Sequence, residues 1–563
     1  MISRAFQASW IYRKPSIAAV VCLAAVLTFI PSAAGQEAGP SEQPAVAPAA
    51  QVQNGPPANR RADVAQFGAR VQSVLTEAHA ARGYWGILVA DRDTGEVLYE
   101  LNADHFFMPA SNAKIFTTAL ALATLGRDYR FRTTLESQAP LGSDGRIAGD
   151  LRLVGRGDPD LSNRVFPYAG RFERDGPVEK VLAEMADAAV AKGLKEVDGD
   201  IVADDSYFPY DPFPEGWTTG DLFFTFGAPV SAIAFNENSF SIDVRPGIRI
   251  GSTAVITTEP NAASDAFRSE ITTSSPGSAP AFAVVRQPGV DFILVRGSIP
   301  LGHAPVQLEF AMTQPAETAA LVLKQLLEAR GVRVTGSTVA QHASPPETTA
   351  AGEPVFPSTG PPASPPPAPV AAVLAEHLSP PLIECIRMTN KISQNLHAEL
   401  LLRTVGREKS GLGSTAAGLK VERDFLAAAG IADGDVVLSD GSGLSRDDLV
   451  TPRAVVALLE YAARQPWGSG FLSTLPVAGV NGTLQDRMKD TPAWGRIEAK
   501  TGSHEDAHAL SGYATSESGE SLVFAIFGNN NRQHGPDATT ALDAIATAMV
   551  ETLGAEPHAM KKK

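Results

Sequence analysis

The stretch FFMPASNAKIFTTALAL, residues 106–122, decides the fold expected for this chain. It predicts a short loop, residues 108–110, that runs into an amphipathic helix with Ser111 at its start. Lys114 follows three residues later, so the two side chains lie on one helix face, one turn apart. A helix N-terminus offers backbone N–H groups and a positive dipole end. A lysine that loses its proton through desolvation can accept the serine proton, so the pair predicts a nucleophile and its base.

Two later motifs bear on this interpretation. Alone, Ser111 could be an ordinary helix N-cap and Lys114 a surface lysine. However, Ser393-Gln394-Asn395 has the form S-x-N, and Lys500-Thr501-Gly502 is a K-T-G followed by Ser503. The ordered set S-x-x-K, S-x-N and K-T-G is typical of serine acyltransferases that recognise penicillin. The set therefore favours the functional interpretation of Ser111.

Acyl transfer from an amide needs a nucleophile, a base, a proton route to the leaving amine and an oxyanion hole. With Ser111 as the nucleophile and Lys114 as the base, Ser393 can relay a proton to the departing nitrogen. Asn395 can hold the backbone amide of the substrate and orient Lys114. Lys500 can supply positive charge for a substrate carboxylate and help to keep Lys114 neutral.

The K-T-G strand completes the expected site. Thr501 can bond the substrate carboxylate, and Gly502 continues the substrate-binding strand. The backbone N–H groups of Ser111 and Ser503 are the expected oxyanion pair. Each donor of such a pair contributes about 3–4 kcal/mol to lowering the barrier.

The first part of the chain predicts export. Residues 1–35 combine a basic start, an apolar run of 15 residues at 16–30 and small residues at 32–35, which is typical of a signal peptide and predicts a periplasmic protein. An uncleaved anchor is the alternative. Residues 36–61 are rich in Pro, Ala and Gln and predict a disordered leader. Cys385 is then the one cysteine of the mature chain and is expected to be a small buried apolar group.

The net charge of −15 argues against nucleic acid as a partner. Peptidoglycan peptides and β-lactams are the partners expected from the motifs. Peripheral membrane association and a homo-oligomer are left open, and no cofactor or metal is expected.

The pattern along the chain predicts an α/β (α+β) fold, in which an antiparallel sheet flanked by helices is split by strand-rich inserted domains. Ser111 and Ser393 are 393 − 111 = 282 residues apart, far more than one crossover needs. The expected organisation is a first catalytic part (62–128), inserted domains II and III (129–343), a proline-rich linker (344–372) and a second catalytic part (373–557). Elements expected in the catalytic parts are a helix (62–81), a hairpin (84–102), helices (379–405, 415–429, 452–465), three antiparallel strands (497–500, 509–514, 521–529) and a closing helix (537–553).

These residues carry a family resemblance. From about Ala62 to Leu553 the chain resembles the peptidase S13 family, the low-molecular-mass class C penicillin-binding proteins. Beyond the three motifs, the resemblance rests on GRGDPDLS (155–162), GDIVADDSYF (199–208), FGAPVSAIAFNEN (226–238), DGSGLSR (440–446), VNGTLQDRM (480–488) and AKTGS (499–503). It implies a transpeptidase-like domain split by domains II and III. It also implies cleavage of the terminal D-Ala of peptidoglycan stem peptides and of D-Ala–meso-diaminopimelate crosslinks, and acylation by penicillins.

The resemblance further implies a pocket for the side chain of diaminopimelate. By motif position, Asp204 and Arg446 match the residues that line it, and a zwitterionic group suits one carboxylate and one bidentate cation. Asp204 could instead pair with a neighbouring cation or cap a turn, and Arg446 could fix its loop. The choice between Asp204 and Asp205 stays open. His504, four residues after Lys500, departs from the family pattern near the substrate pocket.

The sequence also has features of a zinc site, of a β-lactamase and of a wall-binding protein. Residues 504–508 match H-E-x-x-H, but that zinc motif works on a helix, and here it follows a predicted strand. A β-lactamase shares the three motifs, but the chain lacks a dedicated deacylating glutamate motif and the long insertion favours a peptidase. A non-enzymatic wall-binding protein would not need Ser111, Lys114 and Lys500 intact.

Overall fold

The structure is a computed structural model that describes residues 61–77, 80–171, 173–285, 292–345, 372–530 and 537–554. The predicted signal peptide and nearly all of the predicted leader lie outside these residues, as does most of the proline-rich linker. Within the described ranges, no helix is both long and apolar enough to cross a membrane.

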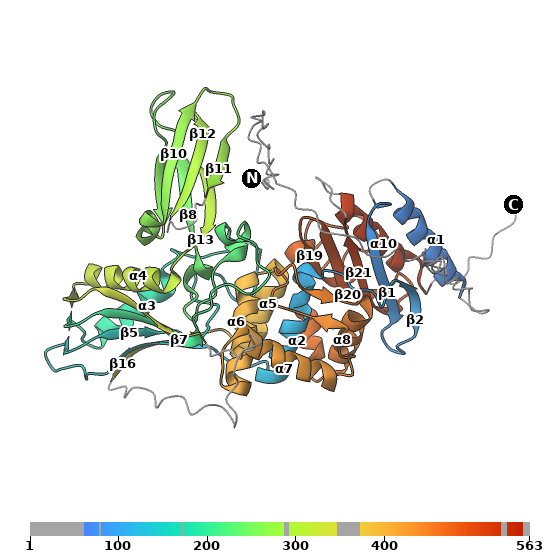
Figure 1. Cartoon of the computed structure of the whole chain (residues 1–563), viewed down its shortest axis with the longest axis horizontal. Helices are drawn as coiled ribbons and strands as arrows, with labels where there is room; N and C mark the ends of the chain where they lie inside the picture. Colours follow the sequence, from blue (N-terminus) through green and yellow to red (C-terminus); the bar gives the residue numbers. More distant parts are fainter. Residues whose placement is uncertain are drawn as a thin grey trace, which may run out of the picture. The chain divides into compact units, whose positions relative to one another are not determined.

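A five-stranded antiparallel sheet with the strand order β19-β20-β21-β1-β2 forms the centre of the catalytic domain (Figure 1). Its strands are β1 (Tyr84–Asp91), β2 (Val97–Leu101), β19 (Ile497–Ser503), β20 (Ala507–Thr515) and β21 (Ser521–Asn529). The predicted hairpin and the three predicted C-terminal strands are therefore confirmed. The sheet joins the first and last parts of the chain, which are separated by the insertion.

Helices cover both faces of this sheet because alternate residues of each strand point to opposite sides. On one face, Ile87 and Val89 pack with α1 (Ala62–Thr76) and α10 (Asp537–Thr552). On the other face, Leu88 and Ala90 pack in a core that includes α2 (Ala113–Leu125), α5 (Leu382–Ile392), α6 (Asn395–Ser410), α7 (Thr415–Ala428), α8 (Pro452–Arg464) and α9 (Gly468–Thr474). This is the predicted fold class.

The helix that follows Ser111 differs in one respect from its prediction. A 3-10 turn over Ala110–Asn112 leads into α2, and every residue from 113 to 122 is buried. The first ten residues of the helix are therefore buried all round, whereas the sequence suggested an amphipathic helix. Burial of residues 113–122 places Lys114 in the interior.

The segment predicted as one helix over 379–405 is two helices. α5 ends at Ser393, whose φ of 63° lies in the left-handed region, and α6 begins after Gln394, whose side chain accepts from the backbone N–H of Leu396. A left-handed residue with a side chain costs about 1–2 kcal/mol. The break places the Ser393 and Asn395 side chains at a junction between helices rather than along one helix face.

The insertion contains a sheet with the order β15-β7-β5-β3-β16. Its strands are β3 (Arg132–Ser137), β5 (Leu151–Val154), β7 (Ile201–Pro209), β15 (Thr338–Ala343) and β16 (Ala372–Leu378), and α3 (Lys180–Ala191) and α4 (Pro315–Ala329) pack in the same core. β16 pairs antiparallel with β3. The boundary predicted at 373 is therefore wrong by one strand, because β16 belongs to the sheet of the insertion.

Three small sheets complete the insertion. One has the order β14-β6-β4, with β4 (Arg146–Ile147), β6 (Glu196–Val197) and β14 (Arg333–Val334). Another has the order β13-β8-β9, with β8 (Ser239–Arg245), β9 (Val255–Glu259) and β13 (Val306–Ala311). The last has the order β10-β12-β11, with β10 (Phe267–Ser274), β11 (Ala281–Val285) and β12 (Ile293–Pro300). The insertion is strand-rich, as the sequence predicts. A short pair, β17 (Val436–Val437) and β18 (Leu449–Val450), flanks the DGSGLSR loop.

Candidate active site

Ser111 and Lys114 meet at the start of α2. Lys114 Nζ lies 2.9 Å from Ser111 Oγ, and the lysine side chain has no exposed surface. Burial lowers the pKa of Lys114 to about 8, although Asp440 and Glu399 oppose the shift. A buried amine with a lowered pKa beside a hydroxyl is suited to act as a base.

Three oxygen atoms surround the amine of Lys114. Besides Ser111, Nζ contacts Asn395 Oδ1 at 2.6 Å and the Ser442 carbonyl oxygen at 2.6 Å. Both of these oxygens can only accept, whereas a hydroxyl can donate. A neutral amine has two N–H groups for the two acceptors and one lone pair left for the Ser111 O–H. When Lys114 is deprotonated, the contacts with Asn395 and Ser442 would therefore leave its lone pair for the Ser111 hydroxyl.

The orientation of the Asn395 amide is fixed from the insertion. Asn395 Nδ2 donates to the Phe226 carbonyl oxygen at 2.8 Å, which leaves Oδ1 to face Lys114. Sequence reasoning missed Phe226, because its contribution is a backbone carbonyl and carries no residue signal.

Lys500 and Ser393 form the second polar pair of the site. Lys500 Nζ donates to Ser393 Oγ at 2.9 Å and to the Thr501 carbonyl oxygen at 2.8 Å. Burial, and then the charge of Lys114, lower the pKa of Lys500 well below its usual range. The sequence predicted that Lys500 keeps Lys114 neutral; in the structure, burial is the largest cause of the low pKa of Lys114.

Two glycines allow backbone segments to meet beside Ser111. A Cβ on Gly502 would lie 2.4 Å from the Pro109 carbonyl oxygen, so β19 could not approach the 3-10 turn with a larger residue. Gly443 has a φ of 77°, and its Cβ would lie 1.8 Å from the Ala110 carbonyl oxygen. Ala110 itself has a φ of 47°. The turn that carries Ser111 is thus held between the K-T-G strand and the DGSGLSR loop.

Asp440 organises that loop. Its carboxylate accepts backbone N–H groups from Ser442 (3.0 Å), Gly443 (2.6 Å), Leu444 (3.0 Å) and Ser445 (2.8 Å), and the Trp217 indole N–H at 2.8 Å. These bonds fix the curve of the loop that brings the Ser442 carbonyl to Lys114. Sequence reasoning quoted the motif but assigned no role to Asp440.

Arg446 and His504 lie together at the other end of the loop. Arg446 Nη1 donates to His504 Nδ1 at 2.8 Å, and His504 Nε2 lies 2.7 Å from the Gly443 carbonyl oxygen. The carbonyl requires a proton on Nε2 and the guanidinium requires a lone pair on Nδ1, so these partners assign the neutral tautomer. Burial and then the charge of Arg446 lower the pKa of His504, in agreement with that form.

The carboxylate that faces Arg446 is Asp221, from the insertion. Asp221 Oδ1 lies 3.6 Å from Arg446 Nη2, and the Arg446 backbone N–H donates to Gly216 O at 3.2 Å. Asp204 instead pairs with Arg152 at 2.7 Å and accepts from Ser206, while Asp205 accepts from Ser231 and contacts His342. Asp204, which the resemblance placed in one pocket with Arg446, therefore pairs with a neighbouring cation instead, and neither Asp204 nor Asp205 is among the residues that line the cavity of Ser111.

A cavity of about 390 Å³ opens at the nucleophile. Of the predicted site residues it collects Ser111, Ser393, Asn395, Arg446, Ser503 and His504, and Asp221, Phe226, Gly443, Leu444 and Glu505 complete its lining. Lys114 and Lys500 lie buried behind it, and Thr501 donates to Thr483 at 2.8 Å. The three motifs thus converge on one concave site.

The H-E-x-x-H segment lies on a hairpin. His504 follows β19, and His508 lies in β20, paired with Ser503. Among the described residues, no group of three or more His, Cys, Asp or Glu is arranged to hold a metal ion. Cys385 is buried as expected but is not in a purely apolar setting, because its thiol donates to Asp160 Oδ2 at 2.9 Å.

The family model of the D-Ala-D-Ala carboxypeptidase 3 (S13) family matches residues 68–355 and 364–549. The chain belongs to the peptidase S13 family. Its members are serine-type peptidases, and the S-x-x-K, S-x-N and K-T-G residues described above lie within the matched ranges.

Curated relatives agree with this assignment. The chain is 34% identical over 495 residues to the D-alanyl-D-alanine carboxypeptidase of an Actinomadura species, covering 86% of this chain and 84% of that protein. It is 27% identical over 449 residues to the carboxypeptidase DacB of Haemophilus influenzae, covering 79% and 85%. The crystal structure of penicillin binding protein 4 from H. influenzae shares the fold of this S13 chain, with a TM-score of 0.69 and 24% identity over 85% of this chain and 98% of that one.

Proposed function

We propose that this S13 peptidase removes the terminal D-Ala from peptidoglycan stem peptides, and cleaves D-Ala–meso-diaminopimelate crosslinks, through an acyl-enzyme on Ser111. The observation that carries the proposal is the set of three contacts on Lys114, which in the deprotonated amine would leave the lone pair for the Ser111 hydroxyl. Penicillins would acylate the same hydroxyl.

The reaction follows from the positions of the side chains. Lys114 takes the Ser111 proton as Oγ attacks the carbonyl carbon, and the Oγ–C bond forms. The backbone N–H groups of Ser111 and Ser503 stabilise the oxyanion. When the C–N bond breaks, Ser393 gives its proton to the leaving nitrogen and is reprotonated from the lysine network. Water then attacks the ester, which releases the shortened peptide and restores Ser111.

The terminal carboxylate of the substrate is assigned to the K-T-G strand. Lys500 Nζ donates to Ser393 Oγ, and Thr501, the next residue of β19, carries a hydroxyl. A bound carboxylate next to Lys500 would raise the lowered pKa of that lysine, so substrate and charged lysine would stabilise each other.

The acyl side of the substrate is assigned to Arg446 and Asp221. The opposite charges, 3.6 Å apart at the mouth of the cavity, suit a side chain that ends in both an amine and a carboxylate, as in diaminopimelate. Asp221 takes the role that the sequence suggested for Asp204. The neutral imidazole of His504 supports Arg446 from the side of β19.

The relatives support the substrate class. The Actinomadura and H. influenzae proteins are D-alanyl-D-alanine carboxypeptidases, and a further H. influenzae structure is a complex with a β-lactam. A cell-wall substrate agrees with the export signal expected at residues 1–35, which would place the enzyme in the periplasm.

The proposal is tested with purified protein, a pentapeptide ending in D-Ala-D-Ala, a crosslinked muropeptide and a fluorescent penicillin. We expect release of D-Ala, cleavage of the crosslink and a stable mass increase on Ser111, all abolished in Ser111→Ala. Rapid turnover of the penicillin would favour a β-lactamase instead. Binding of muropeptides without any product would favour a non-enzymatic wall-binding protein.

A further inference from the structure

A second cavity opens on the other side of Ser393. It has a volume of about 600 Å³ and shares Phe226, Ser393 and Asn395 with the cavity of Ser111. It extends from the break between α5 and α6 to the insertion, where its lining includes Arg164 and Arg171 from the loop after β5, Ser241 from β8, Glu259 from β9, and Gln307 and Glu309 from β13.

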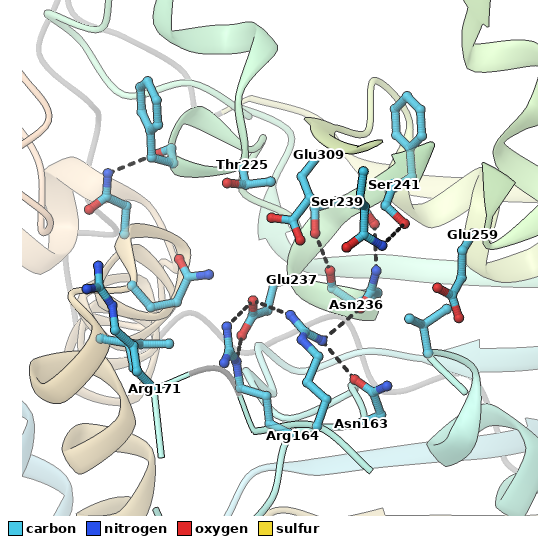
Figure 2. A pocket seen from close by; sticks show the side chains of 18 of the residues that line it. Asn163, Arg164, Arg171, Thr225, Asn236, Glu237, Ser239, Ser241, Glu259 and Glu309 are labelled. Carbon is cyan, nitrogen blue, oxygen red and sulfur yellow. Dashed lines mark hydrogen bonds and ion pairs between the residues drawn. The ribbon is translucent and has the colours of Figure 1, made fainter. Parts of the chain in front are cut away.

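One wall of this cavity is built from buried charges. Figure 2 shows Glu237 beside Arg164; the Arg164 guanidinium binds the Glu237 carboxylate through two nitrogens, one bond being 2.8 Å, and Arg174 adds a bond of 3.0 Å. Two cations therefore share one carboxylate. Arg164 Nη1 is buried and has no hydrogen-bond partner among the described residues. Its positive charge is therefore only partly compensated at this wall of the cavity.

The charges are distributed unevenly around the cavity. Arg171 lies on the side of the site lysines, because its charge contributes to the lowered pKa of Lys500. Figure 2 shows Glu259 on the opposite side of the view from Arg171, with Glu309 between them in the upper middle. An anionic group is therefore favoured at the Ser393 end, and is disfavoured at the far end.

The proposed reaction indicates which part of the substrate would lie in this cavity. Ser393 must reach the nitrogen that leaves when the acyl bond forms on Ser111, so the atoms attached to that nitrogen lie on the Ser393 side. Arg446 and Asp221 occupy the acyl side. A single D-alanine would fill only a small part of 600 Å³. The cavity has room for a larger leaving group.

We infer that the cavity between Ser393 and β13 binds the leaving peptide of a crosslinked substrate beyond the carboxylate assigned to the K-T-G strand, with a further carboxylate of that peptide held at the arginine end. This inference rests on the function proposed above and assigns a second substrate subsite. The Ser111 cavity would bind the acyl strand, and the second cavity would bind the strand that departs. A pentapeptide, whose leaving group is one D-alanine, would use little of the second subsite.

The test compares two substrates in the full mature chain. Gln307→Trp places a bulky ring in the cavity from an exposed position on β13, and Arg171→Gln removes a cation at the Ser393 end. For each variant, kcat/KM is measured for a crosslinked peptide dimer and for a pentapeptide. Thr272→Trp, at an exposed position on β10, and Arg245→Gln, at the end of β8, are the matched controls outside the lining.

We expect the ratio of kcat/KM for the crosslinked dimer to that for the pentapeptide to fall at least tenfold in Gln307→Trp and several-fold in Arg171→Gln, and to stay within twofold in both controls. An unchanged ratio in Gln307→Trp would overturn the inference, and so would an equal loss on both substrates. Labelling of the wild-type protein by fluorescent penicillin is measured in parallel. Failure of that labelling would count against the proposed function itself, whereas failure of the ratio alone would count only against the second subsite.

Discussion

The Asn395 side chain joins the Phe226 carbonyl of the insertion to the amine of Lys114, through contacts of 2.8 and 2.6 Å. Lys114, the base in the proposed reaction, is therefore oriented partly by a segment outside the catalytic domain. The identity of the amide matters, because one end must donate and the other must accept.

We predict that Asn395→Asp slows penicillin acylation at pH 7 by tenfold or more. A carboxylate beside Lys114 would raise the pKa of the amine and keep it protonated, and it would place an acceptor against the Phe226 carbonyl. The rate should partly recover toward pH 10. Stopped-flow acylation across pH checks this, with Gln394→Glu, one residue earlier, as the control. Equal pH profiles for Asn395→Asp and the wild type would contradict the role given to this amide.

The pH dependence of the acylation rate of the wild-type enzyme should reflect the protonation of Lys114. Because burial lowers the pKa of Lys114 to about 8, the deprotonated base is the minor form below that pH and the major form above it. The acylation rate constant should rise about tenfold per pH unit below 8 and level off above it. A profile that is already flat between pH 6 and 8 would mean that Lys114 is not the base.

Substitution of Asp221 should change the substrate selectivity of the enzyme, and substitution of Asp204 should not. Asp221→Asn should lower kcat/KM about tenfold, or ~1.4 kcal/mol, for peptides with a free diaminopimelate end, because Arg446 loses its charged partner. Asp204→Asn breaks the pair with Arg152 and should leave that selectivity unchanged. Steady-state kinetics with peptides that carry or lack the side-chain amine separate the two carboxylates. Loss of selectivity in Asp204→Asn would restore the assignment made from the motif.

The free energy of unfolding should fall as pH rises, because the carboxyl groups of Glu399 and Glu422 are buried. Burial raises the pKa of Glu399 and of Glu422 to about 8, so the native state holds protons that the unfolded chain has lost above pH 4.5. Their contribution is complete below pH 4.5 and is lost as pH rises through 8. Each group can account for at most ~5 kcal/mol between these limits.

Glu422→Gln tests this effect away from the cavity of Ser111. The urea midpoint of the wild type should drop between pH 5.5 and 8.5, and the drop should be smaller in Glu422→Gln. Glu517→Gln, at an exposed position, is the control and should behave like the wild type. If the urea midpoint of Glu422→Gln drops as much as that of the wild type between pH 5.5 and 8.5, Glu422 is not a cause of the pH dependence of stability.

Sequence reasoning located the residues whose type carries the chemistry. Ser111, Lys114, Ser393, Asn395 and Lys500 stand in short motifs with fixed spacing, and the structure brings them together. Hairpin and helix periodicities also placed the central sheet, because alternation and turn residues are local signals.

The parts that were missed depend on contacts distant in sequence. Asp221 reaches Arg446 because Trp217 and Gly216 bind the DGSGLSR loop, and no local pattern encodes that docking. The helix break at Ser393 was hidden because the apolar pattern continues across it. β16 was assigned to the wrong domain because its pairing partner, β3, lies far earlier in the chain.

The pairing of β16 with β3 has a consequence for how this protein can change. The two strands where the polypeptide leaves and re-enters the catalytic domain are neighbours, and Phe131 and Ser379 bond to each other at their base, with distances of 2.9 and 3.0 Å. The chain thus passes between the catalytic domain and the insertion through one two-stranded stem. Residues added to a loop beyond that stem would lengthen the sequence between Ser111 and Ser393 without moving the two strands that leave and re-enter the catalytic domain. The segment of Trp217, Asp221 and Phe226 is the part of the insertion where a change of length would disturb the site.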